Sequence, residues 1–139
     1  MKTITLILLS VLLSLGGATR VQAQRLTLEV HGIERTEGTL YVGVYSSDST
    51  FLRKLYAGFR AEVKTNPLIL PLTGLTAGTY AIGIFHDQNG NGTLDTATFG
   101  IPLEPTGFSN DARGMMGPPE FKDARFTFAQ DTTLVVRLR

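Results

Sequence analysis

The chain has 139 residues, with 13 lysines and arginines against 12 aspartates and glutamates, and no cysteine. Without cysteine there is no disulfide, no thiol nucleophile and no thiolate metal ligand, so a hydrophobic core has to hold the fold together. The basic residues are scattered along the sequence rather than gathered in a run, which argues against a nucleic-acid partner.

The N-terminal 23 residues have the pattern of a bacterial secretory signal peptide. Lys2 precedes an almost unbroken apolar run over residues 4–15, and Val21-Gln22-Ala23 is a small-x-small cleavage site. The run is shorter than the about 20 residues that a membrane-spanning helix needs, and no second apolar run follows. We therefore expect residues 1–23 to be removed, residues 24–139 to form a single domain, and the mature protein to be periplasmic or secreted without a transmembrane segment.

Most of the remaining chain alternates between apolar and polar residues with a period of two, which predicts half-buried strands. In the first of these, Leu26, Leu28 and Val30 fall on one side and their neighbours on the other. The expected strands cover residues 25–30, 40–45, 59–65, 68–72, 79–86, 124–128 and 132–138. A Glu37-Gly38 turn suggests that the first two form a hairpin. About seven short strands separated by turns favour an all-β fold, an antiparallel β-sandwich.

Two segments depart from this alternation. Residues 49–56 repeat apolar side chains at helical spacing after a Ser-Asp-Ser-Thr start, which predicts one or two helical turns that cap the sandwich. Residues 87–123 are rich in glycine and proline and show no sustained period, yet they carry several aromatic and aliphatic side chains. We expect a long ordered loop that packs on the sheet.

The segment from Asp87 to Asp95 has the oxygen spacing of a calcium-binding loop. Its alternate positions carry Asp87, Asn89, Asn91, Thr93 and Asp95, with a glycine at the sixth place. Thr98 stands where such loops have a glutamate, so we expect weak Ca²⁺ binding, with a Kd of about 10⁻⁴ to 10⁻³ M, and Glu104 or Asp111 would complete the shell. A plain turn is the alternative, because both Asn-Gly dipeptides of the segment favour positive φ.

Five further residues are candidate ligand-binding or loop-anchoring groups: His86, Ser109, Asn110, Asp111 and Arg113. A hydrolase built on Ser109, His86 and Asp111 is one hypothesis, but no Gly-x-Ser-x-Gly turn surrounds Ser109. A hydrogen bond from His86 to the loop backbone is the favoured alternative. Arg113 either pins the loop through a salt bridge, which we favour, or binds an anionic ligand.

Tyr41 and Tyr45 fall on the outward side of one expected strand. Exposed aromatic rings on a sheet face would form a sugar-stacking platform, as in a carbohydrate-binding or adhesion module. The favoured alternative is that the predicted helix or the long loop covers these rings.

Several ordered motifs follow one another through the second half of the chain. They are Phe85-His86-Asp87-x-Asn89-Gly90-Asn91-Gly92-x-Leu94-Asp95, Gly100-Ile101-Pro102, Gly107-Phe108-Ser109-Asn110, Ala112-Arg113-Gly114 and Gly117-Pro118-Pro119-x-Phe121. With this set, essentially the whole mature chain resembles the domain-of-unknown-function 2141 family of small exported bacterial proteins. The stretch Gly74-Leu75-Thr76-Ala77-Gly78-Thr79-Tyr80 is also similar to the entry to a strand in transthyretin-like and immunoglobulin-like sandwich modules. The resemblance implies a fold and a compartment, and supplies no reaction.

We therefore expect an exported, non-enzymatic binding or structural module whose partner is a protein or a glycan. A weak calcium loop at residues 87–95 is the one cofactor site considered. The small secreted hydrolase centred on His86 and residues 109–111, and the carbohydrate-binding or adhesion module, remain as alternatives.

Overall fold

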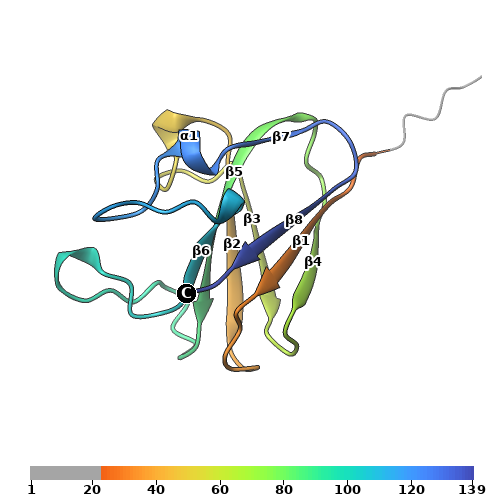
Figure 1. The fold of residues 1–139 in the computed structure, drawn as a ribbon. Coiled ribbons are helices and arrows are strands. Elements are labelled where there is room, and N and C mark those ends of the chain that lie inside the picture. Colours follow the sequence, from red (N-terminus) through yellow and green to blue (C-terminus); the bar gives the residue numbers. More distant parts are fainter. Residues whose placement is uncertain (1–22) are drawn as a thin grey trace, which may run out of the picture.

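The computed structural model of this chain describes residues 23–139, so nearly all of the predicted signal peptide lies outside the described residues. Within this range two β-sheets pack against each other, and the helical elements are all short (Figure 1). The fold is therefore the all-β sandwich that the alternating sequence predicts.

The described residues form eight strands. These are β1 (Leu26–His31), β2 (Thr39–Tyr45), β3 (Ala57–Glu62), β4 (Leu68–Leu72), β5 (Gly78–Asp87), β6 (Thr106–Phe108), β7 (Phe126–Phe128) and β8 (Thr132–Arg137). The helical elements are the 3-10 turns η1 (Asp48–Thr50), η2 (Thr98–Gly100) and η3 (Ser109–Asp111), and the short helix α1 (Phe121–Ala124).

The smaller sheet has the order β4-β1-β8, and the larger sheet has the order β3-β2-β5-β6, with β7 paired to the start of β5. The strand pairs are antiparallel except β1 with β8, which run parallel from the Leu26–Thr132 pair to the His31–Arg137 pair. All seven predicted strands are present with shifted ends, so the prediction of an antiparallel sandwich is confirmed with one parallel pair added.

The predicted hairpin around Glu37-Gly38 is wrong. β1 pairs with β4 and β8 in the smaller sheet, whereas β2 pairs with β3 and β5 in the larger one. Residues 32–38 therefore carry the chain from one sheet to the other. Period-two alternation fixes which side of a strand is buried, but it does not say which strand lies beside it.

Three local predictions are also modified. β6 lies inside residues 87–123, where no strand was expected, and α1 takes up the start of the strand expected at 124–128. Residues 49–56 form the single turn η1 followed by an irregular segment, in which Leu52 has a φ of 57°. Left-handed backbone at a leucine ends a helix, so this segment lies as a turn on the sheet instead.

The main core lies between the two sheets and consists of the residues that alternation marks as inward. On β1, Leu26, Leu28 and Val30 are at most 1% exposed, and Val136 of β8 is fully buried beside them. Each such side chain contributes about 1.5 to 3 kcal/mol on burial. The same cluster contains Ile33, Leu40, Val42, Val44, Val63, Leu68, Leu72, Leu75, Tyr80, Ile82, Ile84, Phe128 and Leu138.

The entry to β5 has a hydrogen bond of the tyrosine-corner type. The hydroxyl of buried Tyr80 donates to the carbonyl oxygen of Thr76, four residues upstream, at 2.9 Å. Gly74 precedes it with a φ of 79°, a left-handed conformation that glycine adopts at no steric cost. This geometry agrees with the sandwich-type motif expected at residues 74–80.

The end of the chain links the two sheets along one edge. Thr106 of β6 and Arg139 exchange two backbone hydrogen bonds of 3.0 Å, directly after β8 ends. Gly107 lies so close to this strand that an added Cβ would be 2.7 Å from the carbonyl oxygen of Arg137. A glycine is therefore required for β6 to reach β8.

We predict that Gly107→Ala lowers the free energy of unfolding by about 1 to 3 kcal/mol, because the new methyl group meets rigid backbone. Urea denaturation measures the change. Gly117→Ala is the matched control, since no atom lies within 4 Å of its added Cβ, and it should stay within about 0.5 kcal/mol of the parent. Equal stability of the two variants would contradict the close contact between β6 and β8.

Candidate functional site

The outer face of the larger sheet carries two rows of residues that run across the strands. In one row, Gly58, Gly43 and Gly83 are direct neighbours on β3, β2 and β5. Leu52 and Leu55 of the 51–56 segment occupy the space that side chains would need here, since a Cβ added at any of the three glycines would lie 2.8 to 3.4 Å from one of them. The glycine row thus lets a loop pack directly on the sheet.

In the neighbouring row Arg60, Tyr41, Phe85 and Thr106 lie side by side on β3, β2, β5 and β6. The rings of Tyr41 and Phe85 stack with centroids 4.9 Å apart and planes 8° from parallel. Because these rings face each other, their shared faces are closed to a ligand. The pair therefore stands on the sheet as one stack in which only the edges and the two outer ring faces are open.

A second apolar cluster covers one part of this outer face. It consists of Phe51, Ala81, Phe121 and Ala124, with Tyr45, Phe108 and Ala112 packed at its border. Tyr45 meets Phe51 edge to face at 5.3 Å, and burial raises the pKa of its hydroxyl above the ordinary value. Tyr45 thus lies under the predicted capping segment, as favoured from the sequence, whereas Tyr41 lies outside this cluster.

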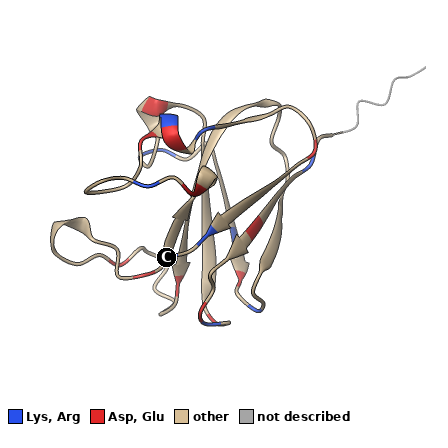
Figure 2. Ribbon diagram, viewed as in Figure 1, with Lys and Arg blue, Asp and Glu red and all other residues tan. Residues whose placement is uncertain are grey.

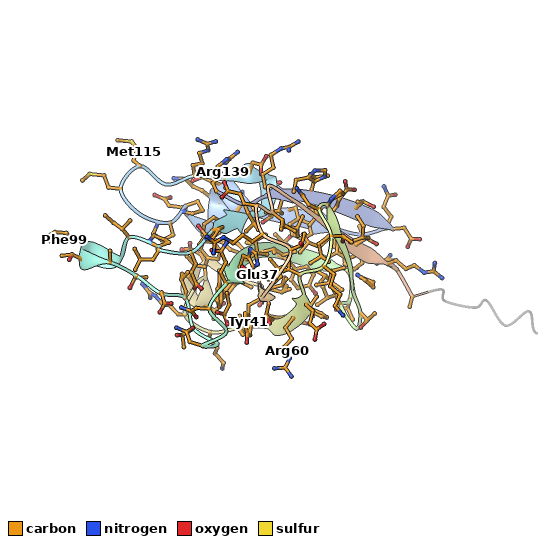
Figure 3. The ribbon with its side chains drawn as sticks, turned by 90° about the horizontal axis from the view of Figure 1, so that it is seen from below. Glu37, Tyr41, Arg60, Phe99, Met115 and Arg139 are labelled. Carbon is orange, nitrogen blue, oxygen red and sulfur yellow. The ribbon has the colours of Figure 1, made fainter. Side chains whose placement is uncertain are left out.

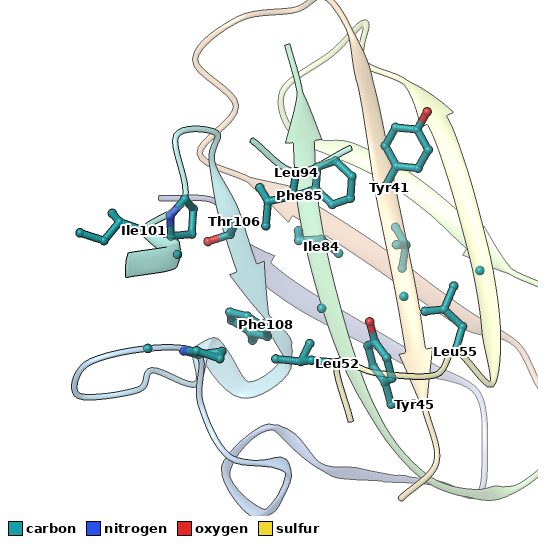
Figure 4. Close-up of a pocket in the computed structure, with 18 of the residues that line it drawn as sticks. Tyr41, Tyr45, Leu52, Leu55, Ile84, Phe85, Leu94, Ile101, Thr106 and Phe108 are labelled. Atoms are coloured by element: carbon teal, nitrogen blue, oxygen red, sulfur yellow. The ribbon is translucent and has the colours of Figure 1, made fainter. Parts of the chain in front are cut away.

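The rest of the outer face is a hollow of about 960 Å³ (Figure 4). Its volume lies in the upper part of the range for small-molecule sites, about 300 to 1,000 Å³, and most of its lining is aromatic or aliphatic. Side chains from the sheet meet side chains from two loops there. The apolar lining includes Tyr41, Leu52, Leu55, Phe85, Leu94, Phe99, Ile101, Pro102, Phe108, Met116 and Pro118.

Two loops project beyond this hollow and carry exposed apolar tips. One loop has Phe99, 98% exposed, and the other has Met115 and Met116, both fully exposed. Figures 1 and 3 show both loops, with Phe99 and Met115, on the same side of the molecule. Figure 2 shows little charge at their tips, with acidic residues at the base of the first loop and the basic Arg113 on the second. Exposed apolar groups gathered in this way mark a contact surface.

The 87–95 loop is organised around a buried carboxylate. Asp87 is 1% exposed, and its two oxygens accept the backbone N–H groups of Gly90 at 2.7 Å and Gly92 at 2.8 Å. Asn89 and Asn91 accept the N–H groups two residues after them, at 3.0 Å and 2.9 Å. Asp87 therefore acts as a cap that closes two successive glycine turns.

The other predicted calcium ligands also face this loop. The side-chain amides of Asn89 and Asn91 both donate to the carboxylate of Asp95, and Thr93 donates to the Asn91 side-chain oxygen. Of the two acids expected to complete a shell, Glu104 is in place and accepts the N–H groups of Gln88 and Asp95.

Asp111 is not at this loop. Its carboxylate accepts the N–H of Arg137 at 3.1 Å and lies 4.0 Å from the guanidinium of Arg139, beside β8. Within residues 23–139 no three His, Cys, Asp or Glu side chains gather closely enough to hold a metal ion by themselves. Calcium binding would therefore depend on the asparagine and threonine oxygens of the loop, and it stays a prediction.

The three residues of the hydrolase hypothesis are not brought together. Ser109 is fully buried; its hydroxyl donates to Ala124 and accepts the N–H of Ile82 at 2.9 Å. Ile82 lies four residues before His86 on β5, a separation of about 13 Å along a strand. Asp111 contacts β8 and the C-terminal residue, as described above. Ser109 thus holds η3 and α1 against β5.

His86 is fully buried and its Nε2 lies 2.6 Å from the carbonyl oxygen of Glu37. Because a carbonyl only accepts, Nε2 carries the proton in this pair, and Nδ1 has no partner among the described residues. The predicted hydrogen bond from His86 to backbone is present. It reaches the turn before β2, however, and not the 87–95 loop.

Asn110 and Arg113 differ in what they contact. The side-chain amide of Asn110 donates to the carbonyl oxygens of Asp123 and Arg125, so it anchors η3 to α1. Arg113 is exposed, and no ion pair holds it within the described part of the chain. The predicted loop-pinning salt bridge is instead the contact of Asp111 with Arg139.

Sequence reasoning did not find the hollow. A glycine at an outward position of β2, β3 and β5 is a signal for close approach of other groups to a sheet, but the three align only once the strand register is known. Exposed apolar residues in a glycine-rich loop are a second signal, but the same residues also fit a loop that packs on the sheet.

The fold and the site define a class of protein: a β-sandwich with an apolar hollow on the outer face of its larger sheet and, in the residues described, no helix long and apolar enough to cross a membrane. Over residues 28–135 the chain matches the family described as "Uncharacterized protein conserved in bacteria (DUF2141)", and it belongs to this family. No curated protein and no solved structure matches it significantly.

We predict that Ser109→Ala lowers the free energy of unfolding by about 1 to 3 kcal/mol, because it leaves the N–H of Ile82 buried without its partner. Thermal or urea unfolding measures this loss. Ser47→Ala is the control, since its hydroxyl bonds only other hydroxyls near the surface, and it should change stability by less than about 0.5 kcal/mol. Labelling of native Ser109 by a fluorophosphonate would contradict a structural role and return the hydrolase hypothesis.

Proposed function

We propose that this protein is an exported, non-enzymatic binding module that holds an apolar ligand in the hollow on the outer face of the larger sheet. The observation that carries the proposal is the coincidence of two features on one face. An apolar hollow of about 960 Å³ opens there, and the loops that line it end in exposed Phe99, Met115 and Met116.

The energetics favour a ligand over a purely structural role. Covering an apolar side chain of this size gains about 1.5 to 3 kcal/mol, and none of that gain is realised while the loop tips face water. The main core of the sandwich is complete without them. The loops therefore have stabilisation to gain only from a group that enters the hollow or covers its rim.

The same face argues against the alternatives. The stacked rings of Tyr41 and Phe85 close their shared faces, which disfavours a sugar platform. Ser109, His86 and Asp111 are each engaged with backbone at separate places, which disfavours the hydrolase. Export to the periplasm or beyond is part of the proposal, and it depends on the signal-peptide pattern of residues 1–23.

Weak calcium binding by residues 87–95 is a second proposal. The loop already places the carboxylate of Asp95 against the amides of Asn89 and Asn91. To bind calcium, the two amides would turn their oxygens toward the ion and release the backbone N–H groups of Asn91 and Thr93. The site would then combine neutral ligands with the carboxylates of Asp87 and Asp95. Such a charge count suits the weak range of extracellular calcium sites.

For the hollow, we predict that the native protein binds the apolar dye N-phenyl-1-naphthylamine and raises its fluorescence. The double variant Phe99→Ser/Ile101→Ser should weaken binding about tenfold, since it removes about 1.4 kcal/mol of apolar contact at the rim. The control is Ile69→Ser/Val135→Ser, which removes two exposed aliphatic residues from the smaller sheet. Equal loss in both double variants, or no dye binding by the folded parent, would refute the site.

For the loop, we predict that calcium at ten times its Kd raises the free energy of unfolding by about 1.4 kcal/mol, and that chelation reverses the shift. Differential scanning calorimetry measures it. Asp95→Asn should abolish the calcium-dependent increase in the free energy of unfolding. Asp131→Asn is the control and should leave the increase intact, because Asp131 lies outside the loop and accepts the backbone N–H of Arg25. No shift at 10 mM calcium, about ten times the weakest expected Kd, would leave the loop as a turn.

A further inference from the structure

The lining of the hollow contains a charged side chain in addition to its apolar ones. Among the described residues that line it, Arg60 is the only charged one. Arg60 is exposed on β3, and no carboxylate in the described part of the chain pairs with it. A guanidinium has five N–H donors in a fixed fork that matches a carboxylate or phosphate. The hollow therefore combines a large apolar surface with one free anion-binding group.

Arg60 and the exposed apolar loop tips lie at opposite ends of the hollow. Arg60 begins the row that continues through Tyr41 and Phe85 to Thr106, which spans four strands, or about 14 Å. Beyond Thr106 the two loops project, and Figure 3 shows Phe99 and Met115 on one side of the molecule, away from Arg60. A ligand that uses the whole hollow thus has an anionic group at one end and an extended apolar body.

We propose that the ligand is a single-chain amphiphile with an anionic head group, a long-chain carboxylate being the simplest member of the class. The head group pairs with Arg60, and the chain lies along Tyr41 and Phe85 toward the loop tips. This inference rests on the proposed function, because it assigns the ligand class of the same hollow. A neutral hydrocarbon would leave Arg60 unused, and a cationic amphiphile would meet it with like charge.

The test is displacement of bound N-phenyl-1-naphthylamine by three compounds that share one chain length and differ in head group. They are dodecanoate, dodecanol and dodecyltrimethylammonium. The two ionic compounds are kept below their critical micelle concentrations and dodecanol below its solubility limit. We expect dodecanoate to displace the dye at the lowest concentration. Arg60→Gln should raise the dodecanoate concentration needed about two- to fivefold, the range for an exposed ion pair of good geometry, and leave the value for dodecanol unchanged.

Arg53→Gln is the matched control, because Arg53 is also exposed but does not line the hollow, and dodecanoate displacement should be unaffected by it. The difference between Arg60→Gln and the parent should shrink at 1 M salt, where the Debye length is about 3 Å. A purely structural effect of Arg60 would change dodecanol and dodecanoate alike.

The outcomes separate this inference from the function on which it rests. Equal displacement by dodecanoate and dodecanol, unchanged in Arg60→Gln, would overturn the anionic head group while the apolar site stands. Failure of the folded parent to bind the dye at all would overturn both. Cosedimentation with phosphatidylglycerol vesicles without displacement by monomeric dodecanoate would overturn the single-chain ligand and make a membrane surface the partner.

Discussion

β5 is packed on both of its faces, and the other features of the molecule depend on this. Toward the smaller sheet it contributes Tyr80, Ile82, Ile84 and His86 to the interior. On its other side, Ala81 packs in the second apolar cluster and Gly83 lies under the 51–56 segment. Phe85 stacks on the ring of Tyr41, and Asp87 holds the 87–95 loop. A strand with one solvated face would have had polar residues in place of Ala81, Gly83 and Phe85. The outer face of this protein is therefore a second packing surface, which the chain covers only in part.

One part of this outer face is covered by the chain itself, and the other part is the open hollow. In the second cluster, Phe51 and Phe121 are held against Ala81 by edge-to-face ring contacts and burial. No such cluster covers the row of Arg60, Tyr41, Phe85 and Thr106, and the exposed apolar side chains of the two loops lie at the rim of the hollow. The main core does not include the residues of this rim, so we expect the sandwich to fold without a ligand. A group that enters the hollow gains the contact that the chain itself does not supply.

Buried polar groups in this region hold the loops in position. Asp87 caps two glycine turns, Glu104 accepts two N–H groups from the loop before it, and Ser109 ties η3 to both α1 and β5. Each is itself buried and accepts backbone N–H groups, and the N–H that Ser109 accepts, that of Ile82, is buried as well. A buried polar side chain is tolerated where it has such partners. The two projecting loops therefore start from rigid bases, although their tips are exposed. This arrangement favours a preformed site over one that assembles only on binding.

The sequence by itself determined the sandwich, because the side chains of a strand alternate with a period of two and every inward position of β1 and β8 is readable from it. It likewise located the turn residues around Asp87, since capping of glycine turns is a local interaction. Only the tertiary structure decided which strands are neighbours, so it alone aligned Gly43, Gly58 and Gly83 and set Arg60 in one row with Phe85. Strand register is a long-range property with no local signal, and a site made from facing strands and two distant loops is visible only when that register is known.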